Sequence, residues 1–120
     1  AWMRGSKRFA SVVSAYDKGY DPILRGAPSV VLAYAADDGW NPVVDCTIAM
    51  ETFELAATAM GLGTCWAGFL MAGAKNNSEA SAVLELPADH TVHAAMMVGY
   101  PAESYHLIPP RKELKCRWMD

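Results

Sequence analysis

The sequence is poor in charge. Charged residues make up 19% of its 120 residues, against about 25% in ordinary globular domains. A small domain has a large surface for its volume, so it should need more charge than average. Hydrophobic residues reach 52%. We therefore expect part of the surface to be covered by a partner, by further chain or by a flat ligand. We expect residues 1–120 to form a single, N-terminally incomplete domain, since the chain opens at Ala1 without an initiator Met.

Positive charge and long apolar runs are also missing. The net charge of −3 is not that of a nucleic-acid binder, which would show a basic stripe. No apolar run reaches the ~18–20 residues of a membrane span, and no signal-peptide pattern is present. We therefore expect no nucleic-acid partner, no membrane partner and a cytoplasmic protein.

Metal-binding and nucleophile motifs are absent from the sequence. The residues that could have supplied them are Cys46, Cys65, Cys116, His90, His93 and His106. No CxxC pair occurs, which excludes a zinc site or an iron–sulfur cluster built from this chain alone. The histidine spacing does not suit a metal-binding helix. We expect no metal, and thiols that serve as small core residues of a reduced protein.

Apolar periodicity predicts a mixed order of helices and strands. Helices are expected over residues 7–18, 43–60 and 80–86, and strands over residues 29–35, 64–71 and 91–98. This order indicates an α+β domain. The helix over residues 43–60 is apolar on most sides, which is typical of a long central helix buried within something larger.

Gly61-Leu62-Gly63 superficially resembles a dinucleotide-binding fingerprint. That fingerprint needs a strand before the glycines and a helix after them, so that the pyrophosphate meets a helix N-terminus. The predicted order here is helix and then strand. These glycines are therefore interpreted as a helix stop.

Two segments could contact a ligand. In Trp66-Ala67-Gly68, small residues beside an aromatic one allow a planar molecule to approach the backbone, although ordinary strand packing would produce the same pattern. In Pro109-Pro110-Arg111-Lys112, two cations follow two prolines, which suits a phosphate but also a solvated tail.

Six blocks of the sequence together resemble the second half of the nitroreductase family, from about residue 19 to the end. They are residues 21–28 (DPILRGAP), 45–49 (DCTIA), 55–57 (LAA), 61–68 (GLGTCWAG), 96–101 (MMVGYP) and 109–112 (PPRK). Their order and spacing match the family. The likeness is greatest to the anaerobe-type subgroup, whose members are often joined to a ferredoxin-like iron–sulfur domain.

The resemblance implies a fold, a cofactor and a reaction. The fold would be a nitroreductase-like α+β domain with a mostly antiparallel sheet flanked by helices, of which this chain holds a part. The protein would be an intertwined homodimer with FMN at the interface. Electrons would pass from NAD(P)H or ferredoxin through the flavin to nitro compounds, quinones or similar small acceptors.

The resemblance also implies site residues. Trp66, Ala67 and Gly68 match the segment whose backbone lies over the flavin. Arg111 and, less closely, Lys112 match the basic residues that hold the FMN phosphate. The flavin carries the chemistry in such enzymes, so no catalytic acid or base is named.

The chain departs from the family pattern at its start. Arg4-Gly5-Ser6-Lys7-Arg8 resembles the family's opening phosphate-binding element, but it precedes the second-half blocks too closely and is interpreted as coincidental. Three functions remain open: an FMN-dependent oxidoreductase, a truncated non-catalytic module with weak or no flavin binding, and a flavin-degrading or dehalogenating member of the superfamily.

Overall fold

The computed structural model describes residues 7–119, except for the side chains of residues 7–9 and 80. Within that part, four helices and three strands follow one another along the chain. Their bounds are α1 Lys7–Asp17, β1 Ser29–Ala36, α2 Pro42–Ala59, β2 Gly63–Trp66, α3 Gly68–Asn76, α4 Ser78–Ala82 and β3 His90–Gly99. The α+β prediction is confirmed.

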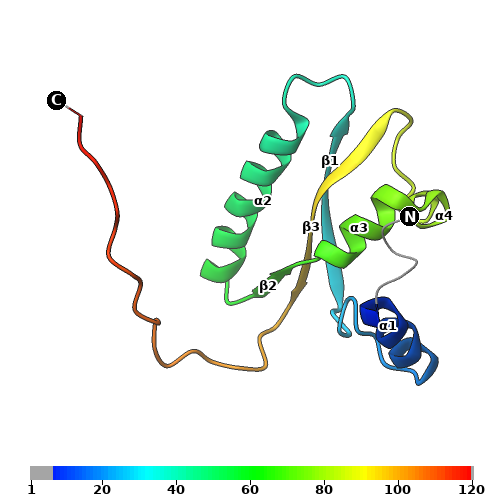
Figure 1. Ribbon diagram of the computed structural model, residues 1–120, viewed down its shortest axis with the longest axis horizontal. Helices are drawn as coiled ribbons and strands as arrows, with labels where there is room; N and C mark the ends of the chain where they lie inside the picture. The colour runs from blue at the N-terminus through cyan, green and yellow to red at the C-terminus, as the bar shows by residue number, and fades with distance from the viewer. Residues whose placement is uncertain (1–6, 120) are drawn as a thin grey trace.

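The three strands form one antiparallel sheet in the order β1-β3-β2 (Figure 1). The last strand in the sequence therefore lies in the middle, where its side chains can be covered on both faces. Its stretch from Ala94 to Val98 is buried throughout. The sheet is the scaffold that fixes the end of β2, where the candidate flavin segment begins.

Helices cover the two faces of the sheet. On one face, Cys46 and Met50 of α2 pack with Ala94 and Met96 of β3. On the other face, a second cluster is formed by Ala67, Ala95 and Met97, with half-buried residues of α3 around it. Alternate residues of β3 thus point to opposite layers, as the pleat of a strand requires.

Within the described chain, helix α2 is buried on one side alone, so its burial within something larger stays a prediction. Cys46, Met50 and Ala57 are its buried residues. Large apolar side chains that remain exposed in the single chain are Val43, Val44, Ile48, Leu55 and Met60. The helix has apolar side chains on most sides, but the described chain supplies only one surface for them to pack against.

Helix α2 ends at Ala59, and Gly61 lies in its stop as predicted. Gly61 has a φ of 79°, in the left-handed region that glycine adopts without strain. The Leu62 N–H donates to the Ala57 carbonyl at 2.9 Å, and the Gly61 N–H donates to the Thr58 carbonyl at 3.0 Å. These two bonds define a Schellman cap. The order helix, glycines, strand is confirmed, so the dinucleotide fingerprint remains excluded.

The predicted strand over residues 64–71 is wrong in its second half. Strand β2 ends at Trp66, and the chain continues as helix α3 from Gly68. The periodicity of a short apolar run does not distinguish a strand from a helix. The contacts of this run with β3 determine that its second half is helical. The helix predicted over residues 80–86 is also displaced, since α4 spans Ser78–Ala82. The Asn77 side chain accepts a hydrogen bond from the Glu79 N–H at 2.9 Å and thereby starts α4 earlier.

The expectation that the thiols are core residues holds for one of the three. Cys46 is buried, whereas Cys65 and Cys116 are exposed. Burial raises the pKa of the Cys46 thiol, because a thiolate is poorly solvated there.

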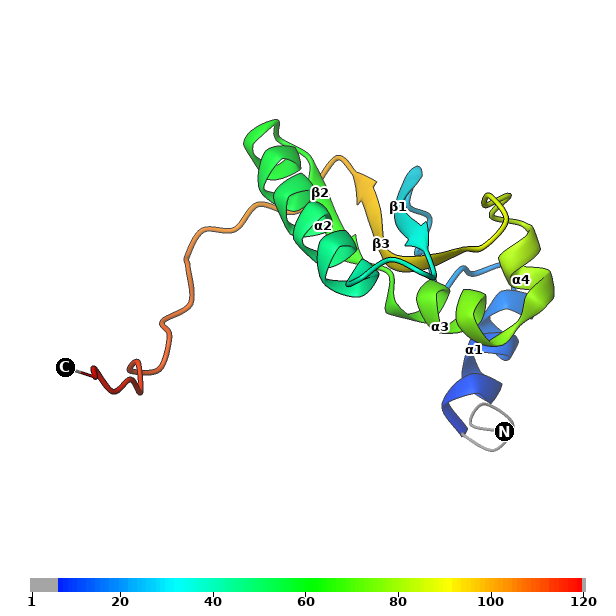
Figure 2. The ribbon, with the colours of Figure 1, turned by 90° about the horizontal axis from the view of Figure 1, so that it is seen from above.

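The chain beyond β3 is an extended tail. Residues 101–119 form no helix or strand, and each of them is exposed. Figures 1 and 2 both show this tail running away from the sheet and its helices. The tail carries the candidate phosphate-binding residues.

Candidate functional site

The candidate flavin segment is the turn between β2 and α3. Trp66 is the last residue of β2 and lies opposite Met96, so both side chains are on the face of the sheet that α2 covers. Because β2 is an edge strand, the Trp66 side chain is 42% exposed. Its ring is thus available at the edge of the molecule.

Ala67 anchors the turn. It is 3% exposed, and its N–H donates to the Ala95 carbonyl at 2.8 Å. Its own carbonyl accepts a hydrogen bond from the Met71 N–H at 3.1 Å, which begins α3. One residue is therefore tied to the central strand and to the following helix. The turn is held rigidly relative to the sheet.

Gly68 leaves open space at the surface of this turn. It is the first residue of α3 and is exposed. A Cβ built at this position would meet no atom within 4 Å, and the φ of Gly68 lies outside the left-handed region. Neither packing nor backbone conformation within the chain requires a glycine here. The absence of a side chain leaves the backbone accessible to a flat ligand, which fits the cofactor that the resemblance implies.

The turn is also supported from α2. The Thr64 hydroxyl donates to the Glu54 carboxylate at 3.0 Å, and the pair is partly buried. This bond joins the start of β2 to the second half of α2. The sequence pattern did not reveal it, because a carboxylate on an apolar helix does not indicate which strand will approach it.

Arg111 and Lys112 lie in the exposed tail. The tail leaves the sheet at Gly99, which pairs with Gly63 at the start of β2, whereas the candidate turn follows the other end of that strand. From there the tail runs away from α3 (Figure 1). The single chain therefore does not bring the two cations together with Trp66, Ala67 and Gly68.

Two further sequence expectations concern metals and the N-terminal basic stretch. No cluster of three or more His, Cys, Asp or Glu side chains that could hold a metal occurs among the described residues. Arg4, Gly5 and Ser6 lie outside the described residues, as do the side chains of Lys7 and Arg8. Among the helices of residues 7–119, none is long and apolar enough to cross a membrane.

Solved structures with the same fold include flavoproteins. A nitroreductase with bound FMN from Bacteroides fragilis is 25% identical, with a TM-score of 0.65 over 96% of this chain and 60% of that one. An iodotyrosine deiodinase bound to FMN and 3-iodo-L-tyrosine is 18% identical, with a TM-score of 0.60 over 98% of this chain and 61% of that one. A putative oxidoreductase from Bacteroides fragilis is 21% identical, with a TM-score of 0.58 over 98% of this chain and 56% of that one.

This chain thus spans about 60% of the length of the solved structures it matches. None of the curated proteins matches it. The family model for the "Nitroreductase family" matches residues 2–100. The match begins earlier than the expected residue 19 and stops before Arg111 and Lys112. On this match over most of its length, the chain belongs to the nitroreductase family.

Proposed function

We propose that this chain is part of an FMN-dependent oxidoreductase. It would pass electrons from a reduced donor, through bound flavin, to nitro compounds, quinones or similar small acceptors. Family membership supports the proposal, as does the likeness to a nitroreductase that contains FMN. The observation that carries it is the turn of Trp66, Ala67 and Gly68, where a rigid backbone is left uncovered beside an aromatic ring.

The residues of this turn would bind and orient the cofactor. Bound FMN would supply the redox chemistry, since flavins accept and release electrons that protein side chains do not carry. Gly68 would let the ring system approach the backbone. Ala67, fixed to Ala95 by its hydrogen bond, would keep that backbone in place. Trp66 would cover part of the cofactor's apolar surface and exclude water.

Arg111 would bind the FMN phosphate, with Lys112 beside it. A guanidinium can bind two phosphate oxygens at once, and an ammonium adds a point charge. In one chain these residues are remote from the turn. The stretch from Pro101 to Arg111 can span roughly 35 Å when extended, comparable to the 32 Å shortest dimension of the molecule. The tail is therefore long enough to reach across a second copy.

A homodimer with flavin at the interface would make use of this reach. It would also cover the exposed apolar residues of α2, of which Ile48 and Leu55 are more than 60% exposed. Apolar surface of this kind is usually buried in an interface. We propose that the tail of one subunit and the turn of its partner form each flavin site.

The electron donor is proposed to be ferredoxin or NAD(P)H. Assignment to the anaerobe-type subgroup would favour a ferredoxin-like iron–sulfur donor. Anaerobic mixing of the flavin-loaded protein with reduced ferredoxin, NADH and NADPH distinguishes them. The donor that bleaches the flavin absorption fastest at equal concentration is the better candidate.

The alternative function is a non-catalytic module with weak or no flavin binding. It is favoured by the separation of the turn after β2 from the exposed tail that carries Arg111 within the single chain. This alternative predicts a folded, colourless protein.

The deciding experiment is an absorption spectrum of the purified protein after addition of FMN and removal of the excess. We expect a retained flavin band in the wild type. Arg111→Ala should weaken FMN binding about 10–100-fold, as expected for loss of charge-assisted hydrogen bonds. Arg117→Ala, which removes the same charge from the same exposed tail, is the matched control and should retain the wild-type affinity.

A protein that folds, by circular dichroism, but retains no flavin contradicts the enzyme proposal and favours the non-catalytic module. Equal loss of FMN in Arg111→Ala and Arg117→Ala contradicts the role of Arg111, because it would show that the tail acts through its net charge rather than through a phosphate contact.

A further inference from the structure

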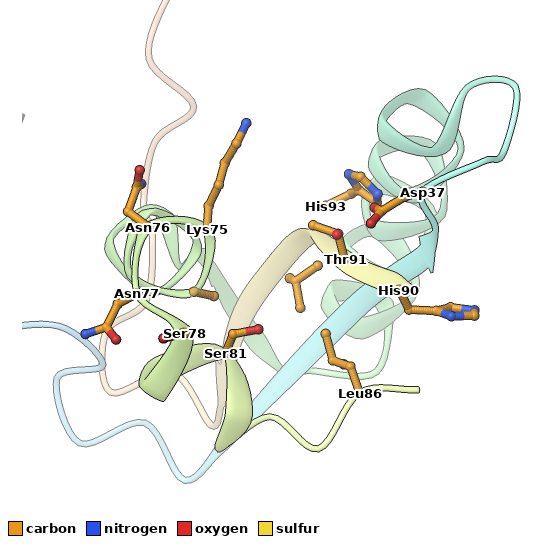
Figure 3. Close-up of a pocket in the computed structure, with 12 residues that line it drawn as sticks. Asp37, Lys75, Asn76, Asn77, Ser78, Ser81, Leu86, His90, Thr91 and His93 are labelled. Carbon is orange, nitrogen blue, oxygen red and sulfur yellow. The ribbon is translucent and has the colours of Figure 1, made fainter. Parts of the chain in front are cut away.

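A cavity lined mainly by polar residues lies at the far end of α3 from the turn of Trp66, Ala67 and Gly68 (Figure 3). Its volume is about 670 Å³, within the range of small-molecule sites. It is lined by the last turn of α3, by α4, by the start of β3 and by Asp37 after β1. None of Trp66, Ala67 and Gly68 lines it. The cavity is therefore separate from the proposed flavin site.

Charges of opposite sign flank this cavity. Lys75 rises from α3, and Asp37 follows the end of β1 on the opposite side of the opening (Figure 3). Each side chain is exposed. No ion pair joins the two in the part of the chain that the structure describes. A simple anion would be repelled by Asp37 and a simple cation by Lys75, whereas a molecule with both charges is attracted at both ends.

His93 lines the same cavity. The Nε2 atom of His93 is buried and has no hydrogen-bond partner among the described residues. His93 is the extra residue of a β-bulge, since Tyr34 pairs with Val92 while Ala33 pairs with Ala94. A bulge redirects a side chain that a regular ladder would have placed elsewhere.

We propose that the cavity binds a small zwitterion of the α-amino-acid class. The carboxylate of the ligand would lie at Lys75 and its ammonium at Asp37. Leu86 and Val92, which also line the cavity, would contact the ligand's side chain. The proposal stands apart from the flavin chemistry, because it uses different residues.

Calorimetric titration of the full chain with each of the twenty protein amino acids tests the proposal. We expect at least one to bind, and we expect its N-acetyl derivative and its amino-alcohol analogue each to bind at least about tenfold more weakly, since each lacks one of the two charges. These ligand analogues require no variant. They therefore keep the test decisive even where a substitution impairs folding.

Variants then locate the site. Lys75→Met and Asp37→Asn should each weaken binding about tenfold or more. Lys115→Met and Asp38→Asn make the same chemical changes at exposed positions that do not line the cavity, and they should bind as the wild type does. Binding by none of the twenty overturns the proposal. So does binding that survives both analogues, or binding that survives both cavity variants.

Discussion

The Thr64 hydroxyl donates a hydrogen bond to the Glu54 carboxylate at 3.0 Å and so joins edge strand β2 to helix α2. Strand β2 pairs with a neighbour on one side only within the described sheet. The hydrogen bond to Glu54 of α2 therefore adds a second attachment to β2, which is otherwise joined only to β3. The strand held in this way leads directly into the turn of Trp66, Ala67 and Gly68.

Loss of this bond should destabilise the fold. Thr64→Val keeps the shape of the side chain and removes the donor. A partly buried hydrogen bond to a charged group contributes about 1.5–3 kcal/mol, so we expect the free energy of unfolding in urea to fall by about 1–2 kcal/mol after allowance for partial exposure. Thr52→Val removes a local bond from Thr52 to the Ile48 carbonyl on an exposed part of α2 and should cost much less. Equal losses would show that the bond between α2 and β2 is of no special importance.

Gly99 should not tolerate a side chain. A Cβ at this position would lie 3.0 Å from Cδ and 3.2 Å from Cγ of Pro28, and a proline ring cannot rotate away. Gly99→Ala is therefore expected to lower the free energy of unfolding by about 1–3 kcal/mol, the usual cost of overpacking. Gly73→Ala places the same methyl group in open space within α3, where it should stabilise by up to about 1 kcal/mol. Effects of the same sign at both positions would contradict this reasoning.

Gly68 offers a test that separates binding from stability. A Cβ there meets nothing within 4 Å, so Gly68→Leu should leave the thermal midpoint unchanged or raise it slightly, since Leu favours helix over Gly. The same side chain would obstruct the approach of a planar ring, and FMN affinity should fall at least about tenfold, or about 1.4 kcal/mol.

Gly73→Leu is the matched control, in the same helix and also in open space. It should retain FMN affinity. An unchanged flavin affinity in Gly68→Leu would remove the turn from the proposed site while leaving the fold assignment intact.

The Asp21 carboxylate makes the free energy of unfolding depend on pH. Its carboxylate accepts hydrogen bonds from the Leu24 N–H at 2.9 Å and the Ile23 N–H at 3.0 Å, and these bonds lower the pKa of Asp21, led by that from Leu24. A lowered folded-state pKa contributes stability above the unfolded value, near pH 4, and the contribution is lost as the pH falls through the folded value.

We therefore expect Asp21→Asn to be less stable than the wild type at pH 7, with the difference shrinking as the pH falls below about 4. Urea unfolding at pH 7 and at pH 3 measures it. Asp38→Asn, an exposed carboxylate after β1, should show little difference at either pH. A difference for Asp21→Asn that stays constant with pH would exclude the carboxylate as its source.

Local rules determined much of the fold. Glycine at the left-handed ends of α1 and α2, and β-branched apolar runs between turn residues, gave the existence and order of most elements, because these signals act over a few neighbouring residues. The family blocks in register likewise pointed to the nitroreductase fold from the sequence. The segment of Trp66, Ala67 and Gly68 was also singled out in this way. Its role in flavin binding remains a prediction.

Tertiary structure alone decided the rest. The run after Trp66 became a helix because Ala67 bonds to Ala95 of a strand far along the chain. The bulge at His93 came from the pairing of β1 with β3. Cys46 is buried and Cys65 exposed because of the layers above and beside them. Such outcomes depend on contacts between residues that are distant in sequence. A local sequence pattern does not indicate which distant residues will meet. The sequence determined most of the elements and their order, and the packing of those elements determined the rest and which surfaces remain open for a ligand.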